Sequence, residues 1–386
     1  MSLSSLKASR VRILLALGLV ASVLGAASVS WLVAHAQSVG AGQSHSAVLK
    51  TGGTIAIWGY NGYGQIGDGT NTQRNVPVEL TGTYSAIALG SIHTLALKSD
   101  GTVWAWGYNG YGQLGDGTTT GRISPVQVTG LTGVVAISAG DGHSVAVKSD
   151  GTVWAWGQNS YGQLGDGTTT SRSVPTQIPG VTGALLVGAG SSHTLIGTAT
   201  GVLAVGYNGY GQLGDGTNTQ RLSPVVVPGV PKAISLGAGA THSVIVATDG
   251  TLWAWGYDGN GALGDGTNGT RNTPVHLTTI SGVSKISASN HTLALKSDGT
   301  VWAWGYNAYG QLGDATTTSR NSPFQVPGIT SDDVSGTSAL AAMYAATGNV
   351  ENLERLGSDV QKTSPESGAE MRNLASALKA QKGVSR

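Results

Sequence analysis

The sequence predicts an all-β fold, a β-propeller of six visible four-stranded repeat units that would form six or seven blades in space. Three observations lead to this prediction. A segment of about fifty residues recurs along the chain, each copy holds four short strand-like stretches, and turn-forming residues separate the stretches. Only 11% of the residues are charged, whereas Trp and Tyr number 10 and 12. This composition favours a folded, β-rich chain over a disordered one.

The N-terminal segment, residues 1–36, has the pattern of a secretory signal. Lys7, Arg10 and Arg12 precede an apolar run at 13–34, and the Ala-His-Ala sequence that ends at Ala36 provides a cleavage site. The alternative is an uncleaved membrane anchor, because the apolar run is long enough to span a bilayer. Both interpretations place the body of the protein outside the cytoplasm, so we expect it to be secreted or held in the cell envelope.

The repeat is clearest where three copies are almost identical. The stretch that begins at His143 reads HSVAVKSDGTVWAWG, and close copies begin at His93 and His291. Aligned on the first His and the last Gly of this stretch, six units fill residues 37–329, which we expect to be one propeller domain. The aligned histidines are His45, His93, His143, His193, His242 and His291, and the aligned glycines are Gly59, Gly107, Gly157, Gly206, Gly256 and Gly305.

Each unit contains four predicted strands, which in the third unit are 134–138, 143–148, 152–156 and 173–178. The fourth strand carries a Pro in every unit, as expected of an outermost strand whose missing N–H faces solvent. Asp-Gly separates the second and third strands in four units, which predicts a hairpin with a tight primed turn. Antiparallel four-stranded units repeated around an axis are the blades of a propeller.

The third unit also carries a family resemblance. Its stretch from His143 to Gly157, followed by NSYGQLGD at 159–166, resembles the repeat of the Regulator of Chromosome Condensation family. The resemblance implies a β-propeller, commonly of seven blades, so six visible units leave the blade number and the ring closure open. Known relatives include a nuclear nucleotide-exchange factor for a small GTPase, which also binds chromatin, and secreted bacterial inhibitors of β-lactamases. The predicted export signal makes the secreted, protein-binding members the nearer parallel.

Several chemical functions are not expected from the composition and the motifs. The chain has no Cys, its net charge is +1, and neither a thiolate site nor a nucleic-acid-binding field is predicted. One His per unit forms a ring of separated residues, so we expect each imidazole to bond to backbone within its blade rather than to a metal. The repeated Gly-Asp-Gly-Thr motif lacks the Lys of a P-loop and the ligand spacing of an EF-hand, and predicts an Asx turn. No asymmetric catalytic constellation stands out, so we predict neither an enzyme nor a cofactor.

Paired tryptophans in the third strand predict packing between blades. In four units two Trp residues alternate along this strand, as at Trp154 and Trp156, and therefore lie on one face of it. The fourth unit departs from this pattern with Leu203 and Val205 and also lacks the Asp-Gly turn. That unit is either a locally thinned blade or a place where something else packs.

The loops after the first and third strands should share one face, because the strands are antiparallel. Their variable and aromatic residues are our predicted binding face: Tyr60, Tyr63, Tyr108, Tyr111, Asp141, Tyr161, Tyr207, Tyr210, Tyr257, Asp258, Asn290, Tyr306 and Tyr309. We expect the Asn residues beside these tyrosines, such as Asn61 and Asn159, to lie on the same face. Tyr, Asn, Ser and Gly are typical of adaptable recognition surfaces. The structural alternative is that each Tyr packs over a Gly of its own loop.

We therefore predict an exported protein-binding scaffold whose partner is a protein of unknown identity. One alternative is a glycan or cell-wall binder that stacks tyrosines on sugar rings, which makes a polysaccharide a second possible partner. Others are a regulator of a small GTPase that acts in nucleotide exchange, and a structural component of a surface layer. Residues 330–386 are expected to be a helical or flexible tail, with short amphipathic helices at 338–346 and 370–382. Contact with a membrane is expected only through an uncleaved N-terminal segment.

Overall fold

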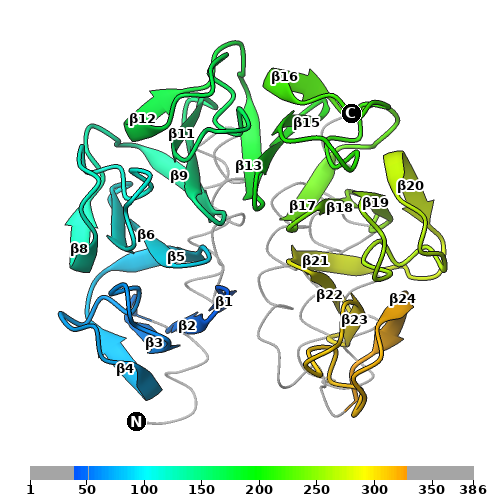
Figure 1. The fold of residues 1–386 in the computed structure, drawn as a ribbon, viewed down its shortest axis with the longest axis horizontal. Coiled ribbons are helices and arrows are strands. Elements are labelled where there is room, and N and C mark those ends of the chain that lie inside the picture. Colours follow the sequence, from blue (N-terminus) through cyan, green and yellow to red (C-terminus); the bar gives the residue numbers. More distant parts are fainter. Residues whose placement is uncertain (1–38, 51, 328–386) are drawn as a thin grey trace, which may run out of the picture. The chain divides into compact units, whose positions relative to one another are not determined.

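The computed structural model describes residues 39–50 and 52–327, which form 24 strands in six four-stranded antiparallel sheets. The predicted all-β propeller of six units is confirmed. Figure 1 shows the sheets as blades around a central axis, with the first strand of each blade innermost and the fourth at the rim. The predicted signal or anchor at 1–36 and the predicted tail at 330–386 lie outside the described residues. No helix in the part of the chain that the structure describes is long and apolar enough to cross a membrane.

The blades follow the chain in order. Blades 1 to 3 consist of β1 (Val39–Ala41), β2 (His45–Leu49), β3 (Ile55–Gly59) and β4 (Arg74–Leu80); β5 (Tyr84–Leu89), β6 (His93–Lys98), β7 (Val103–Gly107) and β8 (Arg122–Gln127); β9 (Val134–Ala139), β10 (His143–Lys148), β11 (Val153–Gly157) and β12 (Arg172–Gln177). Blades 4 to 6 consist of β13 (Ala184–Ala189), β14 (His193–Thr198), β15 (Gly201–Gly206) and β16 (Arg221–Val226); β17 (Ala233–Ala238), β18 (His242–Ala247), β19 (Leu252–Gly256) and β20 (Arg271–Leu277); β21 (Val283–Ala288), β22 (His291–Lys296), β23 (Val301–Gly305) and β24 (Arg320–Gln325).

The second strand of blades 2 to 5 is buried on both faces, because neighbouring blades cover it from either side, whereas β2 and β22 of the terminal blades are partly buried. In β10 the residues from His143 to Val147 are all buried, whereas the outer strand β12, which carries Pro175, is partly exposed. The predicted edge position of the Pro-bearing strand is therefore confirmed. The predicted strands of blade 3 agree with the observed strands to within one residue.

The Asp-Gly hairpins form a different turn from the predicted primed one. In the blade 2 hairpin, residues 98–102, only Gly101 has positive φ, at 79°, and no Asp has positive φ among the described residues. The Gly101 N–H donates to the Lys98 carbonyl, and the Lys98 N–H donates to the Thr102 carbonyl. This pattern is a three-residue loop with a glycine bulge, in which Asp100 keeps the ordinary right-handed backbone. Its carboxylate accepts the Thr102 N–H at 2.9 Å, which favours this arrangement.

The hydrophobic core lies between the blades. One cluster joins Ile57 and Ile66 of blade 1 to Ile87, Ala96 and Trp106 of blade 2, and similar clusters fill the other junctions between consecutive blades. The prediction that the tryptophans pack between blades is confirmed. Blades 1 and 6 lie at the two ends of this series, on either side of an opening in the ring (Figure 1).

Blade 4 keeps all four strands despite its atypical sequence. Its hairpin is tighter than the others, because Thr198 pairs with Gly201 across two intervening residues. Val205 stands where the other blades have a Trp, which is buried in blades 2, 3, 5 and 6, and packs in the junction with blade 3, near Ile178. The blade therefore has the full number of strands, and smaller aliphatic side chains take the place of the missing indole.

Candidate functional site

The loops after the first and third strands share one face of the ring, as predicted. We call the connection between the third and fourth strands of a blade its 3–4 loop; these loops span 60–73, 108–121, 158–171, 207–220, 257–270 and 306–319. The N–H that opens the 3–4 loop donates to the last carbonyl of the loop after the first strand, for example from Gln158 to Gly142 at 2.8 Å. Because this bond recurs in every blade, the two sets of loops form one continuous surface.

The repeated His at the start of the second strand is explained by a hydrogen bond across the junction between consecutive blades, beneath this face. His143 Nε2 lies 3.0 Å from Thr194 Oγ1 of the next blade, and that hydroxyl donates to the Gln163 carbonyl at 2.7 Å. Since the hydroxyl proton is used, His143 must donate from Nε2. The prediction of a backbone partner within the same blade is therefore wrong, because the second strand places the imidazole against the neighbouring blade. Equivalent bonds join His45, His93, His193 and His242 to the following blades.

These imidazoles are neutral in the folded protein. Burial, together with the charge of the nearby His93, lowers the pKa of His143 to about 3. Its Nδ1 is buried without a hydrogen-bond partner in the described structure, so a second proton would have no acceptor. Within residues 39–50 and 52–327, no group of three or more His, Asp or Glu side chains is placed to hold a metal.

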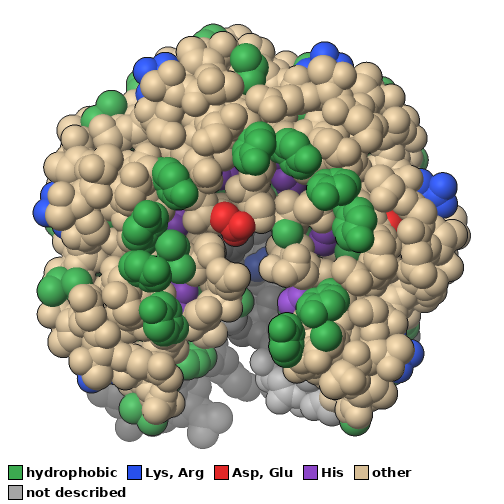
Figure 2. Space-filling model, viewed as in Figure 1, with side chains coloured by type: hydrophobic (Ala, Val, Ile, Leu, Met, Phe, Trp, Pro, Cys, Tyr) green, Lys and Arg blue, Asp and Glu red, His purple; other side chains and the backbone are tan. Residues whose placement is uncertain are grey.

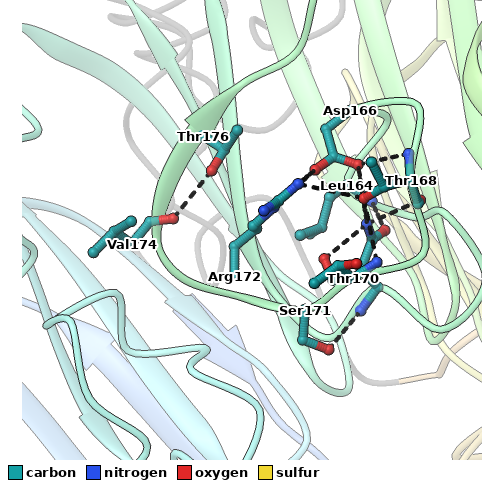
Figure 3. Close-up of polar contacts among 9 residues, drawn as sticks. Leu164, Asp166, Thr168, Thr170, Ser171, Arg172, Val174 and Thr176 are labelled. Atoms are coloured by element: carbon teal, nitrogen blue, oxygen red, sulfur yellow. Dashed lines mark hydrogen bonds and ion pairs between the residues drawn. The ribbon is translucent and has the colours of Figure 1, made fainter.

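Five of the six 3–4 loops are held by one buried Asn and one Asp, and blade 5 has Asp258 in place of the Asn. Figure 3 shows Asp166 of blade 3 between Thr168 and Arg172. Asn159 accepts the Leu164 N–H at 3.0 Å and donates from Nδ2 to Asp166 Oδ1 and to the Thr168 and Thr170 carbonyls at 3.0–3.1 Å. The second oxygen of Asp166 accepts two bonds from Arg172, at 2.7 and 2.9 Å. This network makes the loop rigid before it meets any ligand, although Nε2 of the buried Gln163 has no hydrogen-bond partner in the described structure.

The carboxylate in this loop is strongly held in its ionised form. Burial by itself would raise the pKa of Asp166, but hydrogen bonds from Thr168 and Arg172 outweigh it and lower the pKa. Oδ1 accepts the Thr168 N–H at 3.0 Å, so the predicted Asx turn is confirmed. The Arg partner was not predicted, although internal comparison could have found it, because an Arg follows the loop Asp at the same spacing in all six units.

The Asn residues of the predicted face are buried. Asn61, Asn109, Asn159, Asn208 and Asn307 are 0% exposed, because their amides bond within the loops, so their assignment to the surface is wrong. The same holds for Asp258, which occupies the Asn position in blade 5 and is also 0% exposed. Burial raises the pKa of Asp258 to about 7, and the charge of Asp265 adds to this effect.

The tyrosines do lie on the loop face and form what we call the tyrosine arc: Tyr60, Tyr63, Tyr108, Tyr111, Tyr161, Tyr207, Tyr210, Tyr257, Tyr306 and Tyr309. Figure 2 shows hydrophobic side chains in an arc around the central opening, with most charged side chains at the rim. Neighbouring rings touch, four of these pairs edge to face and two at a tilt of 58°. The centroid distances are 6.2, 5.3 and 6.1 Å along the run from Tyr60 to Tyr111, and 4.9, 6.1 and 5.2 Å along the run from Tyr161 to Tyr257.

The two tyrosines of a loop differ in role. The first lies over the Gly two residues later, as Tyr108 does over Gly110, so the structural alternative is confirmed for these residues in four loops. The second tyrosine is more open in most blades: Tyr63, Tyr111, Tyr161 and Tyr210 are 40–45% exposed, and Tyr309 of the last blade is 87% exposed. Among the first tyrosines only Tyr60, at 43%, is equally open. The second tyrosines therefore offer most of the ring surface available to a ligand.

The arc is interrupted at two places. In blade 3 Gln158 replaces the first tyrosine and lies close to Gly142 and Tyr111, so that the exposed Asp141 sits beside this break. In blade 5 Asn260 replaces the second tyrosine. Asn290 is also exposed, in the loop that precedes β22. Both breaks replace an aromatic ring by an amide, which can donate and accept hydrogen bonds.

Comparison with known proteins gives consistent matches to one repeat family. A family model described as the RCC1-like domain matches residues 27–245. Two models described as the Regulator of chromosome condensation (RCC1) repeat match residues 233–262 and 283–311, and residues 249–295 and 298–339. A comparison with curated proteins gives no match.

Solved structures share the fold at low sequence identity. Human WBSCR16 is 23% identical, with a TM-score of 0.67 over 75% of this chain and 80% of that chain. Prp20p from Saccharomyces cerevisiae is 20% identical, with a TM-score of 0.65 over 75% of this chain and 76% of that chain. Yeast RCC1 (Prp20) bound to Kap60 is 21% identical, with a TM-score of 0.66 over 75% and 74%.

Proposed function

The chain belongs to the family of RCC1-like domains, and from this premise we propose that it is an exported, non-enzymatic scaffold that binds a protein partner through the tyrosine arc. The observation that carries the proposal is the ladder of touching, part-exposed rings on a rigid loop face. Tyr combines a large contact area with few rotatable bonds, so it loses little conformational entropy on binding. Aromatic side chains that are already held in place are the usual anchors of protein interfaces.

The bonding of the loops supports binding rather than catalysis. The polar groups that could do chemistry are repeated from blade to blade and bond to one another, as Asp166 does to Arg172 and His143 to Thr194. The face thus offers rings, amides and one exposed carboxylate at the first break, and these groups suit recognition. The export part of the proposal has a separate basis, the basic and apolar pattern of residues 1–36.

The partner is not inferred from the relatives. Yeast Prp20 has been characterised for its binding to Gsp1p and histones and in a complex with Kap60. At 20–21% identity the similarity shows the fold, and a shared fold does not imply a shared partner. A nucleotide-exchange role toward a small GTPase therefore stays an alternative.

The decisive experiment is affinity capture of envelope and medium proteins with residues 37–386, followed by a binding measurement with the purified candidate. We expect Ala at Tyr63, Tyr111, Tyr161 and Tyr210 to lower the affinity at least tenfold, because each substitution removes a part-exposed ring. The matched control carries Ala at Val76 and Val226, apolar residues of the outer strands that are 69% and 67% exposed. This control should bind like the unmodified protein.

Two results would contradict the proposal. Equal binding by the tyrosine variant would exclude the arc as the contact surface. Competition by soluble polysaccharide, with no protein partner recovered, would favour the glycan-binding alternative, since exposed aromatic rings also stack on sugars. Recovery of the mature protein from the medium or envelope, with sequencing of its N-terminus, tests export and cleavage after Ala36.

A further inference from the structure

One loop of the six departs from the bonding pattern that holds the others. In blades 1, 2, 3, 4 and 6 the Asn amide nitrogen donates to a carboxylate oxygen and to two main-chain carbonyls, at 2.9–3.3 Å. Three oxygens therefore converge on a single N–H₂ group in each of these loops. In blade 5 the residue at this position is Asp258, which has no N–H to give.

The remainder of the blade 5 loop keeps its geometry. Asp258 Oδ1 accepts the Leu263 N–H at 2.8 Å, the bond that the Asn carbonyl oxygen makes in the other blades. Asp265 Oδ1 accepts the Thr267 N–H at 2.8 Å, and its second oxygen accepts Arg271 at 2.9 Å. Asp258 Oδ2 therefore takes the place of the missing amide nitrogen. The acceptors of the amide in the other loops correspond to Asp265 Oδ1 and the carbonyls of Thr267 and Gly269, so we infer that Oδ2 is directed toward these three oxygens.

Asp258 Oδ2 has no hydrogen-bond partner in the described structure. Asp258 is 0% exposed, and its Oδ2 is buried. Arg271 balances one of the two carboxylates, which leaves one negative charge among oxygens that cannot donate a hydrogen bond. An uncompensated buried carboxylate is strongly unfavourable, so this position requires a positive charge.

We propose that the 3–4 loop of blade 5 binds an oxygen-preferring metal cation, of which calcium is the best candidate, between the carboxylates of Asp258 and Asp265 and the carbonyls of Thr267 and Gly269. Two carboxylates alone would not make a metal site, but the two carbonyls raise the set to four oxygens. Calcium accepts mixed carboxylate, carbonyl and water ligands in flexible geometry. Asn260 and Asn268 of the same loop line an open cavity of about 440 Å³.

The sequence of this loop differs from the others around the same point. Four of the other loops have an exposed Tyr and, two residues later, a buried Gln. In blade 5 these two positions hold Asn260 and Ala262. In blade 4 the Gln212 side chain accepts the Tyr210 N–H at 3.0 Å, and this bond has no equivalent in blade 5. The loop therefore has fewer internal bonds than its neighbours, and a bound cation would supply the missing cross-link.

The test uses the full chain, stripped of metal with a chelator and held at pH 8. Calcium chloride is titrated by calorimetry, and thermal unfolding is followed with and without it. We expect one calcium ion to bind per chain and the Tm to rise by about 5 °C at a hundredfold excess over Kd. Asp258→Asn restores the amide of the other five loops, so this variant should fold well, bind no calcium at this site and show no calcium-dependent Tm. Asp141→Asn, which removes an exposed carboxylate outside the loop, should respond like the unmodified chain.

Parallel titrations with magnesium chloride and sodium chloride identify the cation. A rise in Tm with any of the three salts that is lost in Asp258→Asn supports the site. The absence of any such rise, or an equal rise in Asp258→Asn, would overturn the proposal and leave a proton on Asp258 as the compensating charge.

Discussion

The buried histidines predict that the protein is unstable in mild acid. Burial lowers the pKa of His45 and His242 to about 4 and that of His93, His143 and His193 to about 3. The unfolded chain binds these protons near pH 6.5 and the folded chain does not. Stability contributed by the neutral histidines is therefore fully present above pH 6.5 and is lost as the pH falls below that value.

The size of the effect follows from these shifts. At pH 5 each such histidine is almost fully protonated when unfolded and neutral when folded, which costs about 2 kcal/mol. Five histidines give about 10 kcal/mol, comparable with the whole stability of a typical domain. The pKa of Asp258 is raised to about 7, so this residue gains a proton in the folded state as the pH falls. The resulting stabilisation offsets the destabilisation caused by about one histidine. We therefore expect unfolding between about pH 6 and pH 5, above the range in which ion-paired carboxylates take up protons.

The assay is urea unfolding followed by tryptophan fluorescence at pH 7 and pH 5. His143→Gln keeps an N–H donor for Thr194 but cannot take up a proton, so between pH 7 and pH 5 it should lose about 2 kcal/mol less than the unmodified protein. His276→Gln is the control, because His276 is exposed on the outer strand β20, and it should follow the unmodified protein. Parallel pH profiles for all three proteins would refute the reasoning.

Three further predictions concern the junctions and the loops. Gly115→Ala should lower the free energy of unfolding, measured by heat or urea, by more than about 2 kcal/mol, because a Cβ there would lie 2.8 Å from the Trp156 indole. Gly130→Ala is the control: Gly130 has a similar φ of 68° but open space around it, so the loss should be about 1 kcal/mol. Equal losses in the two variants would contradict the close approach at Gly115. Trp156→Phe should lower the free energy of unfolding by about 1–3 kcal/mol, since the indole N–H loses its bond to a carbonyl of the preceding blade, and an unchanged urea midpoint would exclude that contribution. Asp166→Asn should cost about 2–4 kcal/mol by leaving the half-buried Arg172 without its partner, and the loss should persist in 1 M salt, unlike that of an exposed ion pair.

Much of the fold could be predicted from the repeat alone. Strand alternation, the outer-strand Pro and the recurring Gly are local patterns, and the spacing between copies defines the blades. Antiparallel connectivity was also sufficient to place the loops of Tyr111 and Asp141 on one face. These inferences hold because each depends only on neighbouring strands of the same blade.

The partners across the junctions could not be predicted in the same way. The His143 bond to Thr194 depends on how one blade is rotated against the next, which no local pattern encodes. The Asn residues were misplaced for a different reason: in a loop rich in Tyr and Gly, Asn159 has the composition of a recognition surface, yet its amide is used to close the loop. Internal comparison separates these cases. Asn is kept in five of six loops because the fold requires it.

The same comparison indicates where specificity must lie. Exposed tyrosines of nearly identical setting recur around the ring, so by themselves they would bind a ligand in several equivalent registers. The two breaks in the arc remove this equivalence: Gln158 beside Asp141 offers an amide and a carboxylate, and Asn260 offers an amide next to the altered loop of blade 5. A partner that fills the run from Tyr161 to Tyr257 meets a different polar group at each end. The deviations from the repeat, rather than the repeat, therefore define the orientation in which a partner can bind.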